Sequence, residues 1–166
     1  MPFHSGSFLV AKPSLLDPNF RQSVVLIIQH DEEGAFGLVV NRPVPVEGLK
    51  YPVYAGGPCQ TEGLFLLHSI TDWSGSDIPI PEPIAPDIYM ADATYLEEIK
   101  ELDPEQLDQL RLFAGYARWG PGQLEEEICS GAWSFTPADG QTLFGVPADE
   151  LWNHLKPPSI PKPSLN

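Results

Sequence analysis

Residues 22–40 read QSVVLIIQH-DEEG-AFGLVV and contain the clearest strand pattern of the chain. Residues 22–30 are β-branched and nearly continuously apolar, which is typical of a central strand buried on both faces. Residues 31–34 form a polar turn, and Gly34 is able to adopt a positive φ. Residues 35–40 then return as a second strand, so the pattern predicts a β-hairpin over residues 22–41.

Shorter segments on both sides of this hairpin share its strand character. Apolar or aromatic runs predict further strands at residues 7–11, 64–70, 112–119 and 132–135, and a short strand at 87–91. Helical signals come later in the chain. They predict helices at residues 93–102, from residue 103 onward, at 121–129 and at 147–155. Because strands come early and helices late, we predict an α+β fold.

The length of 166 residues fits one domain with one hydrophobic core. We therefore assign residues 1–155 to a single domain, and no internal repeat is visible within it. Residues 156–166 contain four prolines, which predicts a stiff tail that does not pack on the domain.

The charge balance limits the classes of partner. The chain has 23 acidic and 9 basic side chains, and its formal net charge is −14. Such a field repels phosphate backbones and anionic membranes. A well-anchored DNA-binding surface needs roughly 6–10 contacts to phosphates, mostly from Lys and Arg. Nucleic-acid binding is therefore disfavoured.

Other signals concern location and cofactors. Residues 1–19 lack the basic and apolar regions of a signal peptide, and the apolar run at 24–28 is too short to span a bilayer. Cys59 and Cys129 form neither a CxxC pair nor a zinc-ligand spacing. No nucleophile elbow, Walker A loop or GxGxxG fingerprint is present. We expect a cytoplasmic protein with reduced thiols, without a cofactor, a metal site or an assigned catalytic residue.

Four segments together resemble the YqgE/AlgH family of bacterial proteins. They are GSFLVA (6–11) with DPNF (17–20), HDEEGAFGLVVNRP (30–43), GGP (56–58) with LH (67–68), and GYARWGPGQLE (115–125). The resemblance implies a compact, sheet-rich fold similar to a pseudo-barrel with flanking helices. It implies no catalytic or cofactor residues, although the family name is associated with transcriptional regulation. Arg118 and Cys59 depart from the small residue and the valine that the family more often has at these positions.

Two polar positions follow the strands of the hairpin. His30 precedes three acidic residues, a combination that suits a metal ligand or a base, or simply a solvated turn. Arg42 lies at the end of the second strand and is able to bind a carboxylate or phosphate through two hydrogen bonds. An ion pair with one of the many acids is the alternative role for Arg42, and a turn cap is the alternative for Asn41.

The segment from Tyr116 to Gln123 has the strongest signal for a binding site. Its glycines permit close backbone approach, Trp119 offers a flat apolar surface, and a helix is expected to begin near Pro121. This combination suits a small-molecule or peptide site with Gln123 as a polar anchor. In the alternative interpretation, the glycines allow tight strand-to-helix packing and Trp119 fills the core.

We therefore expect a non-catalytic binding or regulatory protein that contacts a protein partner or a small ligand. The candidate ligand-binding residues are Asn41, Arg42, Tyr116, Trp119 and Gln123. The first alternative is an enzyme that uses His30 or His68 with Cys59, Arg42 or Tyr116. The second is a transcriptional regulator, which the acidic charge disfavours.

Overall fold

The long strand β8 (Leu110–Trp119) organises the sheet because three other strands pair with it. It pairs antiparallel with β3 (Gly34–Val39) and β6 (Cys59–His68), and parallel with β5 (Val53–Ala55). The computed structural model describes residues 3–48, 51–71, 82–92 and 103–156. Within these ranges, nine strands form one mixed sheet with the order β4-β5-β8-β3-β2-β1-β9; β6 also pairs with β8, and β7 pairs with β6.

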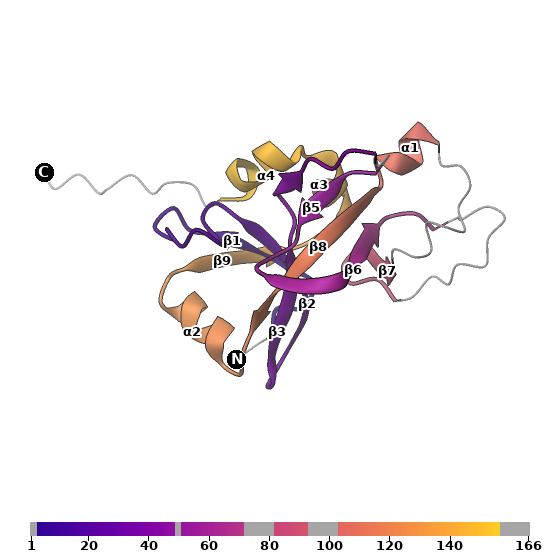
Figure 1. Cartoon of the computed structure of the whole chain (residues 1–166). Coiled ribbons are helices and arrows are strands. Elements are labelled where there is room, and N and C mark those ends of the chain that lie inside the picture. The colour runs from indigo at the N-terminus through magenta and orange to yellow at the C-terminus, as the bar shows by residue number, and fades with distance from the viewer. Residues whose placement is uncertain (1–2, 49–50, 72–81, 93–102, 157–166) are drawn as a thin grey trace, which may run out of the picture.

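The remaining elements attach to this frame. The other strands are β1 (Ser7–Ala11), β2 (Val24–Asp31), β4 (Pro43–Val44), β7 (Tyr89–Asp92) and β9 (Trp133–Pro137). The helices are α1 (Pro104–Leu107), α2 (Gln123–Cys129), α3 (Gly140–Gly145) and α4 (Ala148–Leu155). Figure 1 shows the strongly curled sheet, with α3 and α4 on one side and α2 at the far end of β8. The molecule is a single α+β domain with a half-barrel sheet. The sequence pattern predicted the α+β class, and the family resemblance implied the barrel-like sheet.

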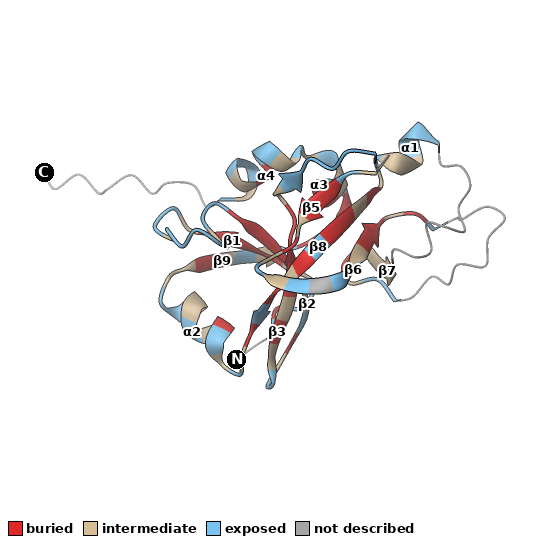
Figure 2. Cartoon of the chain, in the orientation of Figure 1, coloured by how far each residue is buried: buried red, intermediate tan, exposed pale blue. Residues whose placement is uncertain are grey.

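Two main clusters of buried side chains lie on opposite faces of the sheet, because side chains alternate along each strand. In β2, Val24 and Leu26 belong to the cluster that Leu143 of α3 and Leu151 of α4 cover. Val25 and Ile27 belong to the cluster that Leu124 of α2, Trp119 and Trp133 complete. Figure 2 shows buried positions running along the strands. The prediction that this strand is buried on both faces is correct for residues 24–27.

The hairpin and the strand at residues 7–11 form as predicted, with small differences in their ends. The sequence did not predict the short strand β4, the first residues of β6, or α3. β6 begins at Cys59 because the polar residues 60–63 continue the strand through a register shift against β8. α3 begins after Asp139, whose side chain accepts the Thr142 N–H, and glycines at both ends hide it in the sequence.

Two predictions fall outside the described residues: the helix at 93–102 and, except for Lys156, the tail at 156–166. None of the helices in the described ranges has the length and apolar content needed to cross a membrane.

Candidate functional site

An open hollow lies between the β2–β3 hairpin, β6 and β8. We call it the hairpin hollow; its volume is about 450 Å³, and its walls include Gln29, Asp31, Glu33, Phe36, Phe65, Tyr116 and Arg118. Three half-buried rings form its apolar part. The ring centroids of Phe36 and Tyr116 are 5.3 Å apart, those of Phe36 and Phe65 are 5.6 Å apart, and those of Phe65 and Tyr116 are 6.3 Å apart. These separations are typical of favourable tilted and edge-to-face contacts.

The pairing of the strands explains why these side chains meet. Phe36 of β3 lies opposite Gln29 of β2 on one side and opposite Arg118 of β8 on the other. Directly paired residues project from the same face of a sheet, so these three side chains form a row across three strands. The next pair, Ala35 and Trp119, belongs to the buried cluster on the other face.

A single glycine shapes the edge of the hollow. Gly34 ends the turn of the hairpin with φ of +136°, and a Cβ atom there would lie 2.2 Å from the carbonyl oxygen of Trp119. Only a residue without a side chain allows the hairpin tip to approach the end of β8 so closely.

The polar rim is ordered on one side and open on the other. Asp31 accepts hydrogen bonds from the Glu33 backbone N–H at 2.8 Å and from Gln29 Nε2 at 3.1 Å. Arg118 is exposed, and within the described residues no carboxylate lies within ion-pair distance of it. The guanidinium of Arg118 is therefore available to an acceptor group in the hollow.

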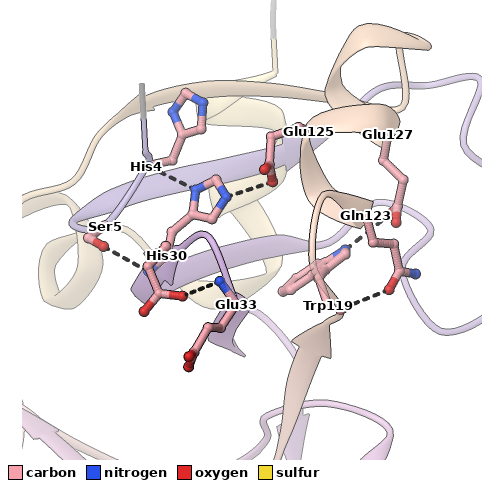
Figure 3. A network of polar contacts seen from close by, with 10 residues as sticks. His4, Ser5, His30, Glu33, Trp119, Gln123, Glu125 and Glu127 are labelled. Carbon is pink, nitrogen blue, oxygen red and sulfur yellow. Dashed lines mark hydrogen bonds and ion pairs between the residues drawn. The ribbon is translucent and has the colours of Figure 1, made fainter. Parts of the chain in front are cut away.

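Two of the predicted ligand-binding residues, Trp119 and Gln123, have structural contacts (Figure 3). The Trp119 side chain is only 2 % exposed, packs on Phe20 and Trp133, and donates from Nε1 to Glu127. Gln123 Oε1 accepts the backbone N–H of Gly120 at 2.9 Å. These contacts fix the connection between β8 and α2. Trp119 and Tyr116 both line the hairpin hollow, but only Tyr116 contributes a half-buried ring to it.

Asn41 and Arg42 lie in a different place, beside α4. They line a second hollow of about 270 Å³, which we call the helix hollow. Asn41 accepts the Val24 N–H at 3.0 Å and donates to the Gln22 carbonyl at 2.9 Å, so its amide already holds two strands together. Of the five predicted residues, Tyr116 and Trp119 therefore line one hollow, Asn41 and Arg42 line the other, and Gln123 accepts a backbone N–H between β8 and α2.

His30 is the centre of a buried polar network that joins three segments (Figure 3). Its Nδ1 accepts the His4 backbone N–H at 3.0 Å, and its Nε2 lies 2.8 Å from Glu125 Oε1. The backbone N–H of His30 donates to Ser5 Oγ at 2.9 Å. Because Nδ1 is an acceptor, the proton of the neutral ring is assigned to Nε2, which donates to Glu125.

This network explains the local electrostatics. The hydrogen bond from His30 lowers the pKa of Glu125, and burial partly opposes this effect. Burial lowers the pKa of His4, the nearby His30 adds to this effect, and Glu125 opposes it. Both ring nitrogens of His30 are occupied, and the residue is only 4 % exposed. The arrangement joins the N-terminal segment and α2 to β2, and it presents no free nitrogen to a substrate.

The residues of the enzyme alternative do not share one cleft. His68 lies opposite Leu110 and Cys59 opposite Tyr116, which are six residues, or roughly 20 Å, apart along β8. His68 is fully buried, and desolvation lowers its pKa to about 4. Arg42 belongs to the helix hollow. Among the described residues, no group of three or more His, Cys, Asp or Glu side chains is placed to hold a metal ion.

Sequence reasoning missed Phe36, Phe65 and Gln29 as parts of a site. The alternation of strand residues places Phe36 on the face opposite the core position Ala35, which is a usable signal, whereas the register shift between Ile27 and Gln29 hides the face of Gln29. Phe65 carries no such signal, because its approach depends on the irregular pairing of β6 with β8.

Comparison with known proteins gives a consistent result. A family model described as AlgH-like matches residues 8–156. A UPF0301 protein of Hahella chejuensis is 39 % identical over 161 residues, covering 87 % of this chain and 83 % of the relative. A UPF0301 protein of Streptomyces avermitilis is 36 % identical, covering 91 % of this chain and 84 % of the relative.

Two solved structures have the same fold. The solution structure of the AlgH protein from Pseudomonas aeruginosa has a TM-score of 0.68 and 30 % identity, and the match covers 92 % of this chain and 86 % of that protein. The crystal structure of protein DIP2367 from Corynebacterium diphtheriae has a TM-score of 0.70 and 29 % identity, with 93 % and 85 % covered.

Proposed function

The chain belongs to the AlgH-like family, and on that premise we propose that it is a non-catalytic binding protein of the cytoplasm. Its ligand, a small molecule or a side chain of a peptide or protein, occupies the hairpin hollow. The rings of Phe36, Phe65 and Tyr116 pack against the apolar part of the ligand, and Arg118 donates to an acceptor group.

One observation carries this proposal. Three half-buried rings converge on one open hollow, and at its rim stands an arginine without an ion pair in the described part of the chain. Ligand sites are typically concave, mainly apolar, and equipped with a few polar groups that fix orientation. A volume of about 450 Å³ lies within the range of such sites.

The other two functions have weaker support. An enzyme built on His30 or His68 with Cys59 or Arg42 requires these groups within hydrogen-bond reach, and they lie in separate parts of the fold. A regulator that binds duplex DNA directly has to overcome a net charge of −14.

A thermal-shift screen of the full chain with metabolites and short peptides tests the proposal. A ligand at a hundred times its Kd stabilises the fold by about 2.7 kcal/mol, which is a midpoint shift of roughly 5–10 °C at this size. We expect at least one hit whose shift is lost in Tyr116→Leu and reduced in Arg118→Gln.

The matched control is Phe135→Leu, because Phe135 is an exposed aromatic residue that does not line the hollow. This variant should bind every hit as the unchanged chain does. Hits that survive Tyr116→Leu and Arg118→Gln without loss, or a panel that gives no shift at all, would contradict the hairpin hollow as the binding site.

A further inference from the structure

The helix hollow is independent of the proposed site and has a different chemistry. It lies between the β1–β2 connection, the end of β3 and α4, which packs beside β1 (Figure 1). Trp152 of α4 fixes this arrangement, because its Nε1 donates to the Ala11 carbonyl at 2.7 Å. The side chains that line the hollow are mostly polar: Arg21, Gln22, Asn41, Arg42, Ala148, Asp149, Trp152 and Asn153.

Arg42 is held rigidly at the wall of this hollow. Its two terminal nitrogens donate to the backbone carbonyls of Asn19 and Arg21. A guanidinium has five N–H donors, so these two bonds leave three for another acceptor. Because the side chain is already fixed by the protein, a ligand does not need to order it, and less conformational entropy is lost on binding.

The positive charge of Arg42 is not neutralised by direct contact. Within the described residues, no carboxylate lies within ion-pair distance of its guanidinium, in contrast to the ion pair that the sequence suggested. Partial burial lowers its pKa, and Asp17 opposes this effect from a greater distance. A carboxylate in bidentate geometry stabilises a partly desolvated cation of this kind through two charge-assisted hydrogen bonds.

The balance of charges in the hollow defines the ligand further. Arg21 and Arg42 bring two of the nine basic residues of the chain into one place, and Asp149 is the acid among the lining residues. The lining side chains carry two positive charges and one negative charge, and Asp17 outside the lining also acts on Arg42. The two arginines favour one carboxylate, and Asp149 favours a hydrogen-bond donor next to it over a second negative charge.

We propose that the helix hollow binds a small monocarboxylate that carries a hydrogen-bond donor next to the carboxylate. Arg42 and Arg21 bind the carboxylate, and Asp149 accepts the neighbouring hydroxyl or ammonium group. Asn153 and Gln22 provide amide groups at the sides. Both α-hydroxy acids and α-amino acids have this chemistry.

Titrations of the ¹⁵N-labelled full chain, followed by NMR, test the proposal with four probes. Glycolate and glycine have the carboxylate and the donor, acetate has the carboxylate alone, and methylamine has the ammonium group alone. We expect glycolate or glycine to shift the resonances of Asn153 and the Trp152 indole, with at least about tenfold higher affinity than acetate or methylamine. Whichever of the two binds more tightly identifies the donor as hydroxyl or ammonium.

Two substitutions test separately the side of the site that binds the carboxylate and the side that accepts the neighbouring donor. Arg21→Gln should weaken the better probe about tenfold or more, and it leaves the hydrogen bond from Arg42 to the backbone carbonyl of residue 21 possible. Asp149→Asn should bring the affinity of that probe close to the affinity of acetate. Lys12→Gln, which removes one positive charge at a residue that lines neither hollow, should leave all affinities unchanged.

Several outcomes would overturn the proposal. They are no shift at Trp152 or Asn153 with any probe, equal affinities of acetate and the two donor-bearing probes, and binding that Arg21→Gln does not weaken. Tighter binding of acetate than of glycolate or glycine to the unchanged chain would contradict the role of Asp149.

Discussion

His68 is a buried histidine whose contacts define its protonation. It is fully buried on β6, stacks on Tyr89 with ring centroids 5.6 Å apart, and accepts the Ile70 backbone N–H at Nδ1. Desolvation disfavours the charged ring and lowers the pKa of His68 to about 4. The residue lies in the core and lines neither hollow.

This shift predicts a pH dependence of stability. Between about pH 6.5 and pH 4, the unfolded chain binds a proton at His68 that the folded chain does not bind. The contribution of His68 to the free energy of unfolding has its full value above about pH 6.5. It falls with decreasing pH by up to about 1.4 kcal/mol per unit. NMR titration of the His68 ring should give a midpoint near 4, and a midpoint at 6 or above would contradict the assignment.

His68→Phe provides the matched variant, because a phenyl ring can still stack on Tyr89. The variant loses the acceptor for Ile70 and is therefore less stable at every pH. Its urea midpoint should nevertheless change less between pH 6.5 and pH 4.5 than the midpoint of the unchanged chain. An equal slope in both proteins would show that His68 does not cause the dependence.

At the scale of elements, the turn between β2 and β3 depends on Gly34. Alanine at this position has to tolerate φ of +136° and a Cβ atom 2.2 Å from the Trp119 carbonyl oxygen. Strain and displaced backbone together should cost roughly 2–4 kcal/mol of the free energy of unfolding. Gly34→Ala should therefore lower the urea midpoint clearly, without a change of slope.

Gly48→Ala is the matched control for this prediction. Gly48 also has a positive φ, of +80°, but a Cβ atom there meets nothing within 4 Å. The Gly48→Ala substitution should lower the free energy of unfolding only by the conformational strain, roughly 1–2 kcal/mol. If both variants lose the same stability, close packing of the hairpin tip against β8 is not the reason for the glycine.

The elements that were predicted correctly are those with local signals. The hairpin has a long apolar run, a polar turn and a returning strand, and α4 has acidic residues in its first turn. The course of β6 through residues 60–63 was missed because polar residues form the strand there, and only the partner β8 defines the pairing. Strand pairing over such distances in sequence is a tertiary property that no local pattern contains.

The candidate site was predicted only in part for the same reason. Tyr116 and Arg42 each line a hollow, but the sequence gives no means to see that they lie in different ones. Trp119 and Gln123 have residue types common in binding sites, and the fold uses both for internal contacts. Residue chemistry identifies candidates, whereas the curl of the sheet determines which of them meet.

At the scale of the whole molecule, the charge of −14 is poorly compensated. Among the described residues, no Lys or Arg side chain lies within ion-pair distance of a carboxylate, and Glu125 pairs only with the neutral His30 ring, so most acids have no nearby cation. Folding brings these charges together and raises their mutual repulsion, which destabilises the compact state.

Salt should therefore stabilise the protein. Raising sodium chloride from about 10 mM to about 100 mM shortens the Debye length from about 30 Å to about 10 Å and screens this repulsion. We expect the midpoint of thermal unfolding to rise by a few degrees, equally with sodium and potassium chloride. In the double variant Glu32→Gln with Glu126→Gln, which removes two exposed charges, the rise should be smaller because less repulsion remains to be screened. A midpoint that falls with salt would mean that attractive pairs outweigh the repulsion in the folded chain.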